Sequence, residues 1–203
     1  MNRRTMLAGI IAAPLATIAN PAEAKPRKKK RWVKSDPRER MRQKYFPDVE
    51  LQTHEGNTVR FYSDLVKDKI VVFNFMYATC NGTCVPTTAN LRKVHKLLEP
   101  RMGKDVFFYS LTLQPETDSV EVLKKFAANQ NIGAGWSLLT GKPTDLERLR
   151  RSLGFSDPDP KRDAVRTNHA AMLRYGNEPK MYWAGCPALI RPEAIAQSIR
   201  WLG

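Results

Sequence analysis

The pattern of apolar residues predicts a sheet of buried strands. Residues 70–77 form a nearly continuous apolar run, and residues 106–113 form a second one. Runs of this kind are typical of strands that are covered on both faces of a parallel sheet. Residues 136–139 and 169–175 predict two shorter strands, and residues 49–62 predict a β-hairpin around a Glu55-Gly56 turn.

Between these strands, apolar residues recur at the spacing of amphipathic helices. The residues that define the helices are Leu91, Val94 and Leu98; Val120, Leu123 and Ala127 after an Asp118-x-x-Glu121 start; Leu146, Leu149 and Leu153; and Ile195, Ile199 and Leu202 after Pro192. Strands that alternate with helices predict an α/β fold with a central sheet flanked by helices and an N-terminal β-hairpin. A length of 203 residues suits one such domain, which we place at residues 46–203.

The N-terminus has the pattern of an export signal. Residues 6–19 are apolar, Arg3 and Arg4 precede them, and Ala22-Glu23-Ala24 provides a cleavage site. We therefore predict a signal peptide over residues 1–24 and a mature chain that begins at Lys25. The paired arginines favour twin-arginine export, with an ordinary secretory signal as the alternative. The run is short for a transmembrane helix, although permanent anchoring stays open.

Charge is concentrated directly after this signal. The chain carries 34 Lys/Arg and 20 Asp/Glu, and eleven of the cations but only two of the anions lie in residues 25–44. This segment lacks hydrophobic periodicity, so we predict a disordered basic arm over residues 25–45. Such an arm suits the anionic surface of a membrane, whereas an exported protein would not meet nucleic acid as a partner.

The sequence CNGTC, residues 80–84, lies between the first buried strand and a helix. This is the thioredoxin arrangement, in which the positive end of the helix favours thiolate over thiol. Residues four apart can lie on one face of a helical turn, close enough for a disulfide or for a shared metal ion. A disulfide, a redox couple and a metal site therefore stay open for Cys80 and Cys84.

Three histidines could complete a metal site. His54 lies beside a predicted turn, and His95 lies off the apolar face of its helix, so we expect neither to bind metal. His169 opens a predicted strand, and strand ends commonly line ligand sites in α/β folds. His169 is therefore the candidate ligand, with a strand-end hydrogen-bonding role as the alternative.

Across residues 46–203 the chain resembles the SCO/SenC family of exported thioredoxin-fold proteins. The resemblance rests on the stretches FYSDLVKDKIVVFNFMYATCNGTC, SLTLQPETDSVEVLKKFA, GWSLLTG and NHAAMLRYG, which occur in the order of that family. It implies a thioredoxin-like fold and a copper ion, Cu(I) or Cu(II), bound by Cys80, Cys84 and His169. Two thiolates and one imidazole suit copper, although thiolate-rich sites also bind zinc.

The chain departs from the family pattern at three positions near the expected site. Val85 follows the second cysteine where the family has proline, Gln114 replaces an aspartate before Pro115, and Asn168 stands where an aspartate often precedes the histidine. These changes leave the three ligands intact but remove two carboxylates that could support them.

Three functions compete. The resemblance implies a copper metallochaperone that delivers copper to an acceptor protein such as the copper centre of cytochrome c oxidase. The alternative is a thiol-disulfide oxidoreductase in which Cys80 and Cys84 are the catalytic pair, and the third is a protein with a static disulfide. Cys186 is expected to be a small core residue, with thiol exchange or chain linkage as alternatives, and Met172 is expected to face away from His169.

Overall fold

The structure, a computed structural model, describes residues 36–79, 82, 84–165 and 171–203. Its centre is a seven-stranded sheet in the order β2-β1-β5-β4-β3-β6-β7. The strands are β1 (Glu50–Thr53), β2 (Thr58–Arg60), β3 (Ile70–Met76), β4 (Val106–Thr112), β5 (Trp136–Gly141), β6 (Met172–Asn177) and β7 (Tyr182–Pro187). Strands β3, β4 and β5 are parallel, and β1 and β6 pair antiparallel to β5 and β3. The predicted α/β fold and hairpin are confirmed.

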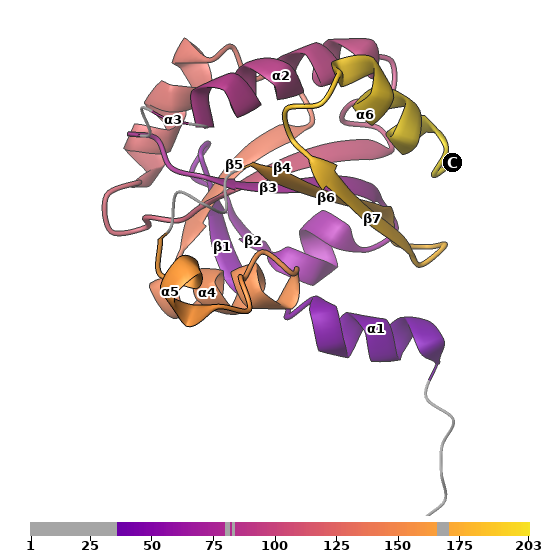
Figure 1. Ribbon diagram of the computed structural model, residues 1–203, viewed down its shortest axis with the longest axis horizontal. Helices are drawn as coiled ribbons and strands as arrows, with labels where there is room; N and C mark the ends of the chain where they lie inside the picture. Colours follow the sequence, from indigo (N-terminus) through magenta and orange to yellow (C-terminus); the bar gives the residue numbers. More distant parts are fainter. Residues whose placement is uncertain (1–35, 80–81, 83, 166–170) are drawn as a thin grey trace, which may run out of the picture. The chain divides into compact units, whose positions relative to one another are not determined.

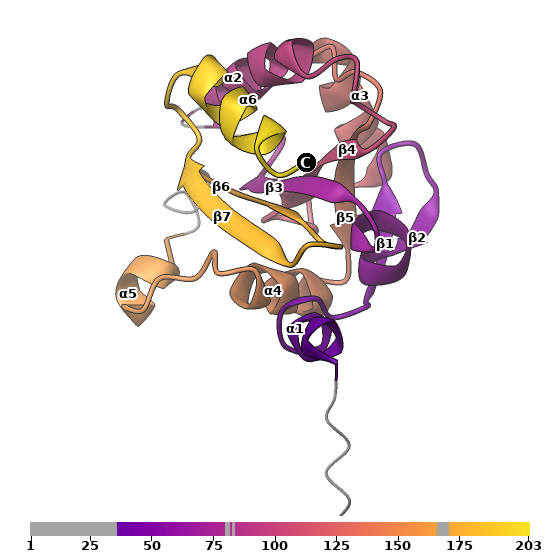
Figure 2. The ribbon, with the colours of Figure 1, turned by 90° about the vertical axis from the view of Figure 1, so that its right-hand side faces the viewer.

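Helices cover both faces of this sheet (Figures 1 and 2). Helices α2 (Cys84–Leu97), α3 (Val120–Asn129) and α6 (Pro192–Arg200) pack on one face, and α4 (Pro143–Ser152) packs on the other. The remaining helical segments are α1 (Pro37–Tyr45), the short π-helix η1 (Phe61–Val66) and α5 (Pro160–Asp163). No helix among the described residues is both long and apolar enough to span a membrane.

Two hydrophobic clusters, one on each side of the sheet, form the core. Alternate residues of β3 belong to different clusters: Val72 and Met76 pack beneath α2 and α6, whereas Phe73 packs beneath α4. Every residue of β3 is buried. This explains why the sequence of β3 is continuously apolar rather than alternating, because both faces of a central strand are covered.

Helix α1 corrects the predicted extent of the arm. Residues 37–45, expected to be disordered, are helical and begin with Asp36 as N-cap and Pro37 at the first position. Arg38 connects this helix to the sheet, since its guanidinium donates to both carboxylate oxygens of Glu178 at 2.7 and 2.5 Å and to Asp68 at 2.5 Å. The domain boundary therefore lies near residue 37 rather than residue 46.

Strand β7 was not predicted from the sequence. Tyr182–Pro187 is mostly exposed and contains Gly185, so its sequence lacks a buried face. Pairing with β6 along its whole length, from Met172↔Pro187 to Asn177↔Tyr182, supplies the backbone partners that make it a strand.

Candidate metal centre

Cys84 is the first residue of α2, directly above the end of β3. Its side chain is buried and belongs to the same cluster as Met76 and Leu91. The first turn of α2 contains no acidic residue. The helix dipole therefore acts on this sulfur without an opposing carboxylate on the same turn and favours the thiolate, whereas burial of the sulfur among apolar side chains acts in the opposite direction.

A buried carboxylate fixes the chain that leads from β3 toward the cysteines. Asp118 has no exposed surface, and it accepts hydrogen bonds from the backbone N–H of Ala78 at 3.1 and 3.3 Å and from the hydroxyl of Thr112 at 2.5 Å. Thr112 in turn accepts from the N–H of Gln114 at 2.9 Å. Asp118 thus connects the end of β4 to the residue two positions before Cys80.

This role for Asp118 was missed in the sequence, where it was interpreted as the start of a helix. The N-cap of α3 is Ser119, whose hydroxyl accepts from the N–H of Val122. The available signal was the Gln114-Pro115-Glu116-Thr117-Asp118 motif, which follows a strand end. Although Gln114 replaces the first acidic residue of that motif, its last carboxylate is present and lies beneath the candidate site.

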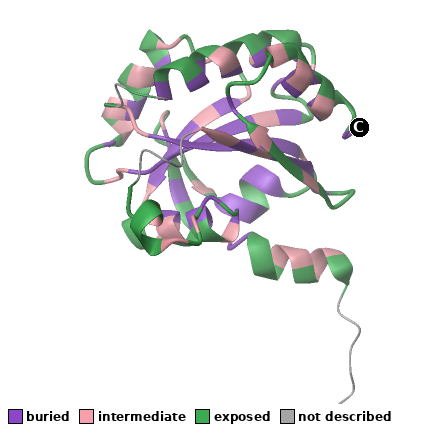
Figure 3. Ribbon diagram, viewed as in Figure 1, coloured by how far each residue is buried: buried purple, intermediate pink, exposed green. Residues whose placement is uncertain are grey.

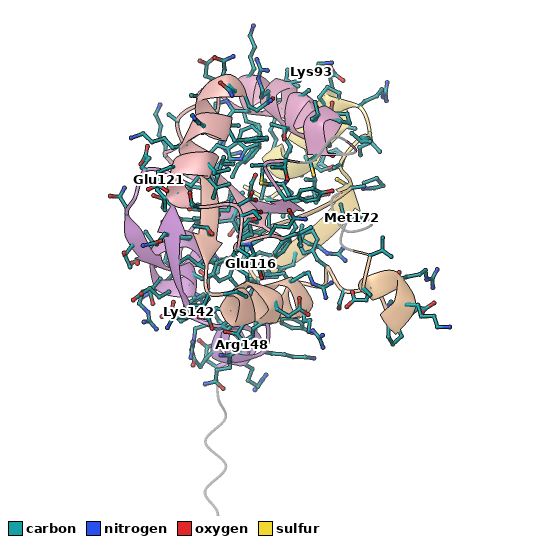
Figure 4. The ribbon with its side chains drawn as sticks, turned by 90° about the vertical axis from the view of Figure 1, so that its left-hand side faces the viewer. Lys93, Glu116, Glu121, Lys142, Arg148 and Met172 are labelled. Carbon is teal, nitrogen blue, oxygen red and sulfur yellow. The ribbon has the colours of Figure 1, made fainter. Side chains whose placement is uncertain are left out.

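The chain enters β6 at the end of the sheet where it leaves β3. The two strands are antiparallel, with Phe73 opposite Arg174, so the start of β6 lies toward the end of β3. Figure 4 shows Met172 at this start. The carbonyl of Ala171 also accepts a hydrogen bond from the N–H of Ala188 at 2.7 Å. Met172 packs with the cluster on the α4 side of the sheet, opposite to the cluster that holds Cys84.

Cys80 and His169, the other two predicted ligands, lie outside the described residues. Among the residues that the structure describes, no group of three or more His, Cys, Asp or Glu side chains is arranged to hold a metal. Of the three predicted ligands, Cys84 is the one that lies among the described residues. A buried sulfur at a helix N-terminus fits copper chemistry, because Cu(I) prefers soft thiolate ligands.

Cys186 lies on the same side of the sheet as Cys84. It pairs with Leu173 across β6 and β7 and packs against the cluster that contains Cys84, although it is only half-buried rather than the core residue that we expected. Burial raises the pKa of the Cys186 thiol, and a hydrogen bond with Tyr175 only partly offsets this. A raised pKa disfavours the reactive thiolate form.

The other two histidines have structural contacts. Nδ1 of His54 accepts a hydrogen bond from the N–H of Leu138 at 3.2 Å, and burial lowers the pKa of His54. His95 lies off the apolar face of its helix, as expected, but it is not simply solvated: its Nε2 lies 2.8 Å from the carbonyl of Ala134 and its ring stacks on Trp136. His95 therefore packs against the connection between α3 and β5.

Comparison with known proteins identifies the family. The sequence profile described as SCO1/SenC matches residues 37–202, which is most of the chain and begins at α1. The chain belongs to the SCO1/SenC family. The resemblance drawn from the sequence is thereby confirmed, and the family match supports the earlier domain boundary that α1 indicates.

Individual relatives agree with this assignment. The SCO1 protein homolog of Bacillus subtilis (strain 168) is 33% identical over 92 residues, which are 45% of this chain and 46% of that protein. The match to this curated relative thus spans less than half of its length.

Two solved structures support the thioredoxin-like fold of this family. BsSco, described as a member of the Sco family of cytochrome c oxidase assembly proteins, has a TM-score of 0.61 at 23% identity, covering 76% of this chain and 90% of its own. Yeast Sco1 with copper bound has a TM-score of 0.59 at 16% identity, covering 76% and 92%.

Proposed function

We propose that this SCO1/SenC protein is a metallochaperone that binds copper and delivers it to an exported or membrane cuproprotein. One observation carries the proposal: the end of β3, the buried Cys84 at the start of α2 and the start of β6 lie at the same end of the sheet. The chain segments that bear Cys80 and His169 connect directly to these three points. Copper is the cargo in this function, as it is the ion bound in the structure of yeast Sco1.

The proposed ligands are Cys80, Cys84 and His169. The two thiolates hold Cu(I), which accepts low coordination numbers, and the imidazole supplies the nitrogen donor that Cu(II) requires in addition. Because Cys84 is buried, its sulfur is shielded from water, which limits competing oxidation. Asp118 holds the chain before Cys80 through Ala78, so it is a positioning residue rather than a ligand.

We further propose that the protein acts outside the cytoplasm, in the periplasm or at the outer face of the cytoplasmic membrane. The export signal in residues 1–24 and the basic segment after it support this location. The acceptor would then be an exported cuproprotein such as the copper centre of cytochrome c oxidase, and BsSco is described as belonging to a family of assembly proteins for that oxidase.

A second candidate function is thiol-disulfide exchange, in which Cys80 and Cys84 reduce the cysteines of the acceptor. The placement of Cys84 at the N-terminus of α2 favours it, because a helix N-terminus stabilises the attacking thiolate. Thiol-disulfide exchange needs both thiols but no imidazole. Substitution of His169 should therefore impair copper binding but not thiol exchange, which distinguishes the two functions.

The test is a copper titration and a thiol count on His169→Ala. A copper carrier should lose Cu(II) binding and the thiolate-to-copper absorption band while still forming the Cys80–Cys84 disulfide. His95→Gln is the matched control, because His95 contacts Ala134 and Trp136 instead of the candidate site. Unchanged Cu(II) spectra in His169→Ala would remove this histidine from the site and favour the oxidoreductase.

A further inference from the structure

Two aromatic side chains are exposed at the end of the sheet that is opposite to the candidate metal centre. Among the described residues, Trp201 and Tyr182 are the most exposed of the large apolar side chains, at 77% and 63%. Trp201 follows the last residue of α6, and Tyr182 is the first residue of β7. Figure 3 shows the exposed residues along β7 and on the outer side of α6.

Hydrogen bonds connect the two segments that bear these aromatic residues. The carbonyl of Leu202 accepts from the side-chain amide of Asn177 at 2.9 Å and from the ammonium group of Lys180 at 3.0 Å. Asn177 lies directly opposite Tyr182 in the ladder of β6 and β7. Residues opposite each other in a ladder have their side chains on the same face of the sheet, so Tyr182 lies on the face that α6 covers, at the C-terminal end of that helix.

The end of α2 and the turn before β7 complete this surface. The guanidinium of Arg200 donates to the carbonyl of Leu97, the last residue of α2, at 2.7 Å. Leu97 is exposed, and so is Met181, which directly precedes Tyr182. We call these four exposed apolar residues the terminal patch: Leu97, Met181, Tyr182 and Trp201.

The terminal patch and the candidate metal centre lie at opposite ends of β3. Asn177 pairs with Ile70, the first residue of β3, whereas Cys84 lies beyond the last residue of this strand. A strand of seven residues is about 20 Å long. Figure 2 faces the end with the patch and shows the C-terminus and the turn between β6 and β7 above α1.

Folding does not account for the apolar character of the patch. Met181 has a φ of 55°, in the left-handed region that glycine adopts without strain, and yet it carries a large side chain. An exposed apolar side chain contributes little to folding, since burial is what makes it stabilising. Single exposed apolar residues are common, but several at one end of a molecule are typical of a binding surface.

The basic segment of the chain joins the domain at this same end. Residues 25–35 contain seven Lys/Arg and no Asp or Glu. The helix that follows them, α1, begins after Asp36, and Arg38 in its first turn pairs with Glu178 at 2.5 Å. Glu178 lies in the turn between β6 and β7, which also bears Met181. The cationic segment therefore connects to the domain next to the terminal patch.

Two cations flank the patch itself. Lys180 and Arg200 donate to main-chain carbonyls rather than to carboxylates, so these hydrogen bonds do not neutralise their charges. Glu99 and the terminal carboxylate of Gly203 lie at the same end of the chain segments concerned. The charge of the patch is therefore nearly balanced, and residues 25–35 provide most of the positive charge at this end.

We propose that the terminal patch contacts the anionic surface of a membrane. Trp and Tyr favour the boundary between lipid headgroups and acyl chains, because each combines a large apolar ring with a polar group. Residues 25–35 supply the electrostatic attraction to anionic lipid, and the patch supplies the apolar contact. A bilayer surface is broad enough to contact all four residues at once, although they come from three segments of the chain.

This inference goes beyond the proposed function and does not depend on copper. It does assign an orientation to the domain. With the terminal patch on the membrane, the length of β3 holds Cys84 about 20 Å away from the lipid surface. The candidate metal centre then faces the aqueous phase, where the soluble part of an acceptor protein can reach it.

The experiment measures the partition of the chain from Lys25 onward between buffer and lipid vesicles. The vesicles contain equal parts of phosphatidylcholine and anionic phosphatidylglycerol, and pure phosphatidylcholine vesicles provide the neutral comparison. The variants are Trp201→Ser and Tyr182→Ser, which remove apolar area, and Trp201→Tyr, which keeps an aromatic ring with a polar group.

Leu189→Ser is the matched control. Leu189 is 50% exposed and lies two residues after Pro187, which pairs with Met172 at the start of β6. The control therefore makes the same kind of substitution at the end of the sheet that bears the candidate metal centre.

We expect Trp201→Ser and Tyr182→Ser each to weaken partition onto anionic vesicles by about fivefold or more, because each loses a large apolar group from the contact. Trp201→Tyr and Leu189→Ser should stay within about twofold of wild type. All variants should unfold at the wild-type temperature, since the substituted side chains are mostly exposed. Salt screens the attraction of residues 25–35, so partition should fall in high salt while the ratio between wild type and Trp201→Ser persists.

A second measurement locates Trp201 directly. Lipids with brominated acyl chains quench the fluorescence of tryptophans that enter the bilayer. The wild type should be quenched on anionic vesicles, and Trp201→Ser should be quenched less.

Three results would overturn the proposal. The first is equal partition of wild type, Trp201→Ser and Tyr182→Ser onto anionic vesicles. The second is a loss in Leu189→Ser as large as that in Trp201→Ser, which would show that the effect does not belong to this end of the sheet. The third is a wild-type dimer in sedimentation experiments that Trp201→Ser dissociates, which would assign the terminal patch to a second copy of this chain.

Discussion

Removal of the Asp118 carboxylate tests how the fold supports the candidate metal centre. Asp118→Ala leaves the N–H of Ala78 and the hydroxyl of Thr112 without their acceptor in a site where the carboxylate has no exposed surface. A buried donor without an acceptor costs about 1–3 kcal/mol, so two donors indicate a loss of about 2–6 kcal/mol in the free energy of unfolding.

This magnitude is large compared with the stability of a typical domain, which is about 5–15 kcal/mol. With a urea dependence of about 2 kcal/mol per molar, the midpoint of urea unfolding should fall by about 1–3 M. Asp118→Asn keeps the shape and one acceptor oxygen, so it should lose less stability. Because the chain before Cys80 is no longer held by a carboxylate, we expect about tenfold weaker copper binding in Asp118→Asn.

Asp105→Ala is the matched control for Asp118. Asp105 is half-exposed and pairs with Arg101 at 2.5 Å, and an exposed pair of this kind contributes less than about 1 kcal/mol. If Asp118→Ala were as stable as Asp105→Ala, the inferred role of Asp118 in holding β3 and β4 together would be wrong. If Asp118→Asn lost stability but bound copper as tightly as the wild type, the inferred role of Asp118 in positioning the metal centre would be wrong.

Two further predictions concern the N-terminal part of the chain. Burial alone would raise the pKa of Glu178, but hydrogen bonds from Arg38, the N–H of Asp68 and Tyr62 outweigh it and lower the pKa. A lowered folded-state pKa gives stability that is present above the unfolded value of about 4.3 and is lost as the pH falls through the folded value. The thermal unfolding temperature should therefore fall more steeply with decreasing pH in the wild type than in Glu178→Gln. Equal pH dependence of the two unfolding temperatures would contradict this. Deletion of residues 25–35, which keeps α1, should leave copper binding unchanged and weaken co-sedimentation with anionic vesicles in low salt, since each nearby cation contributes about 1 kcal/mol to such binding. Equal vesicle binding with and without this segment would rule out its electrostatic role.

The α/β fold and most of its elements could be predicted from the sequence because their signals are local. Burial of β3 on both faces requires an unbroken apolar run, and the helical spacing of Leu91 and Val94 marks the face of α2 that packs on the sheet. The family assignment was also predictable, since it depends on the CNGTC sequence and a few other short stretches in a given order. His169 stays a prediction as a ligand, as does Cys80.

Other features depend on partners that are distant in the sequence. Helix α1 has no buried residue of its own, and Arg38 pairs with Glu178, 140 positions away, so the segment looked like a solvated arm. Strand β7 is mostly exposed and is a strand because β6 provides its hydrogen bonds.

The same reasoning explains why the role of Asp118 was not recognised. An aspartate near a helix start has the local pattern of a cap, and its burial becomes apparent when β3 and β4 are placed side by side. Local conformational preference and the burial pattern depend on residues that are close in the sequence, so they can be predicted from it. Hydrogen bonds between distant segments form only after the sheet has brought those segments together.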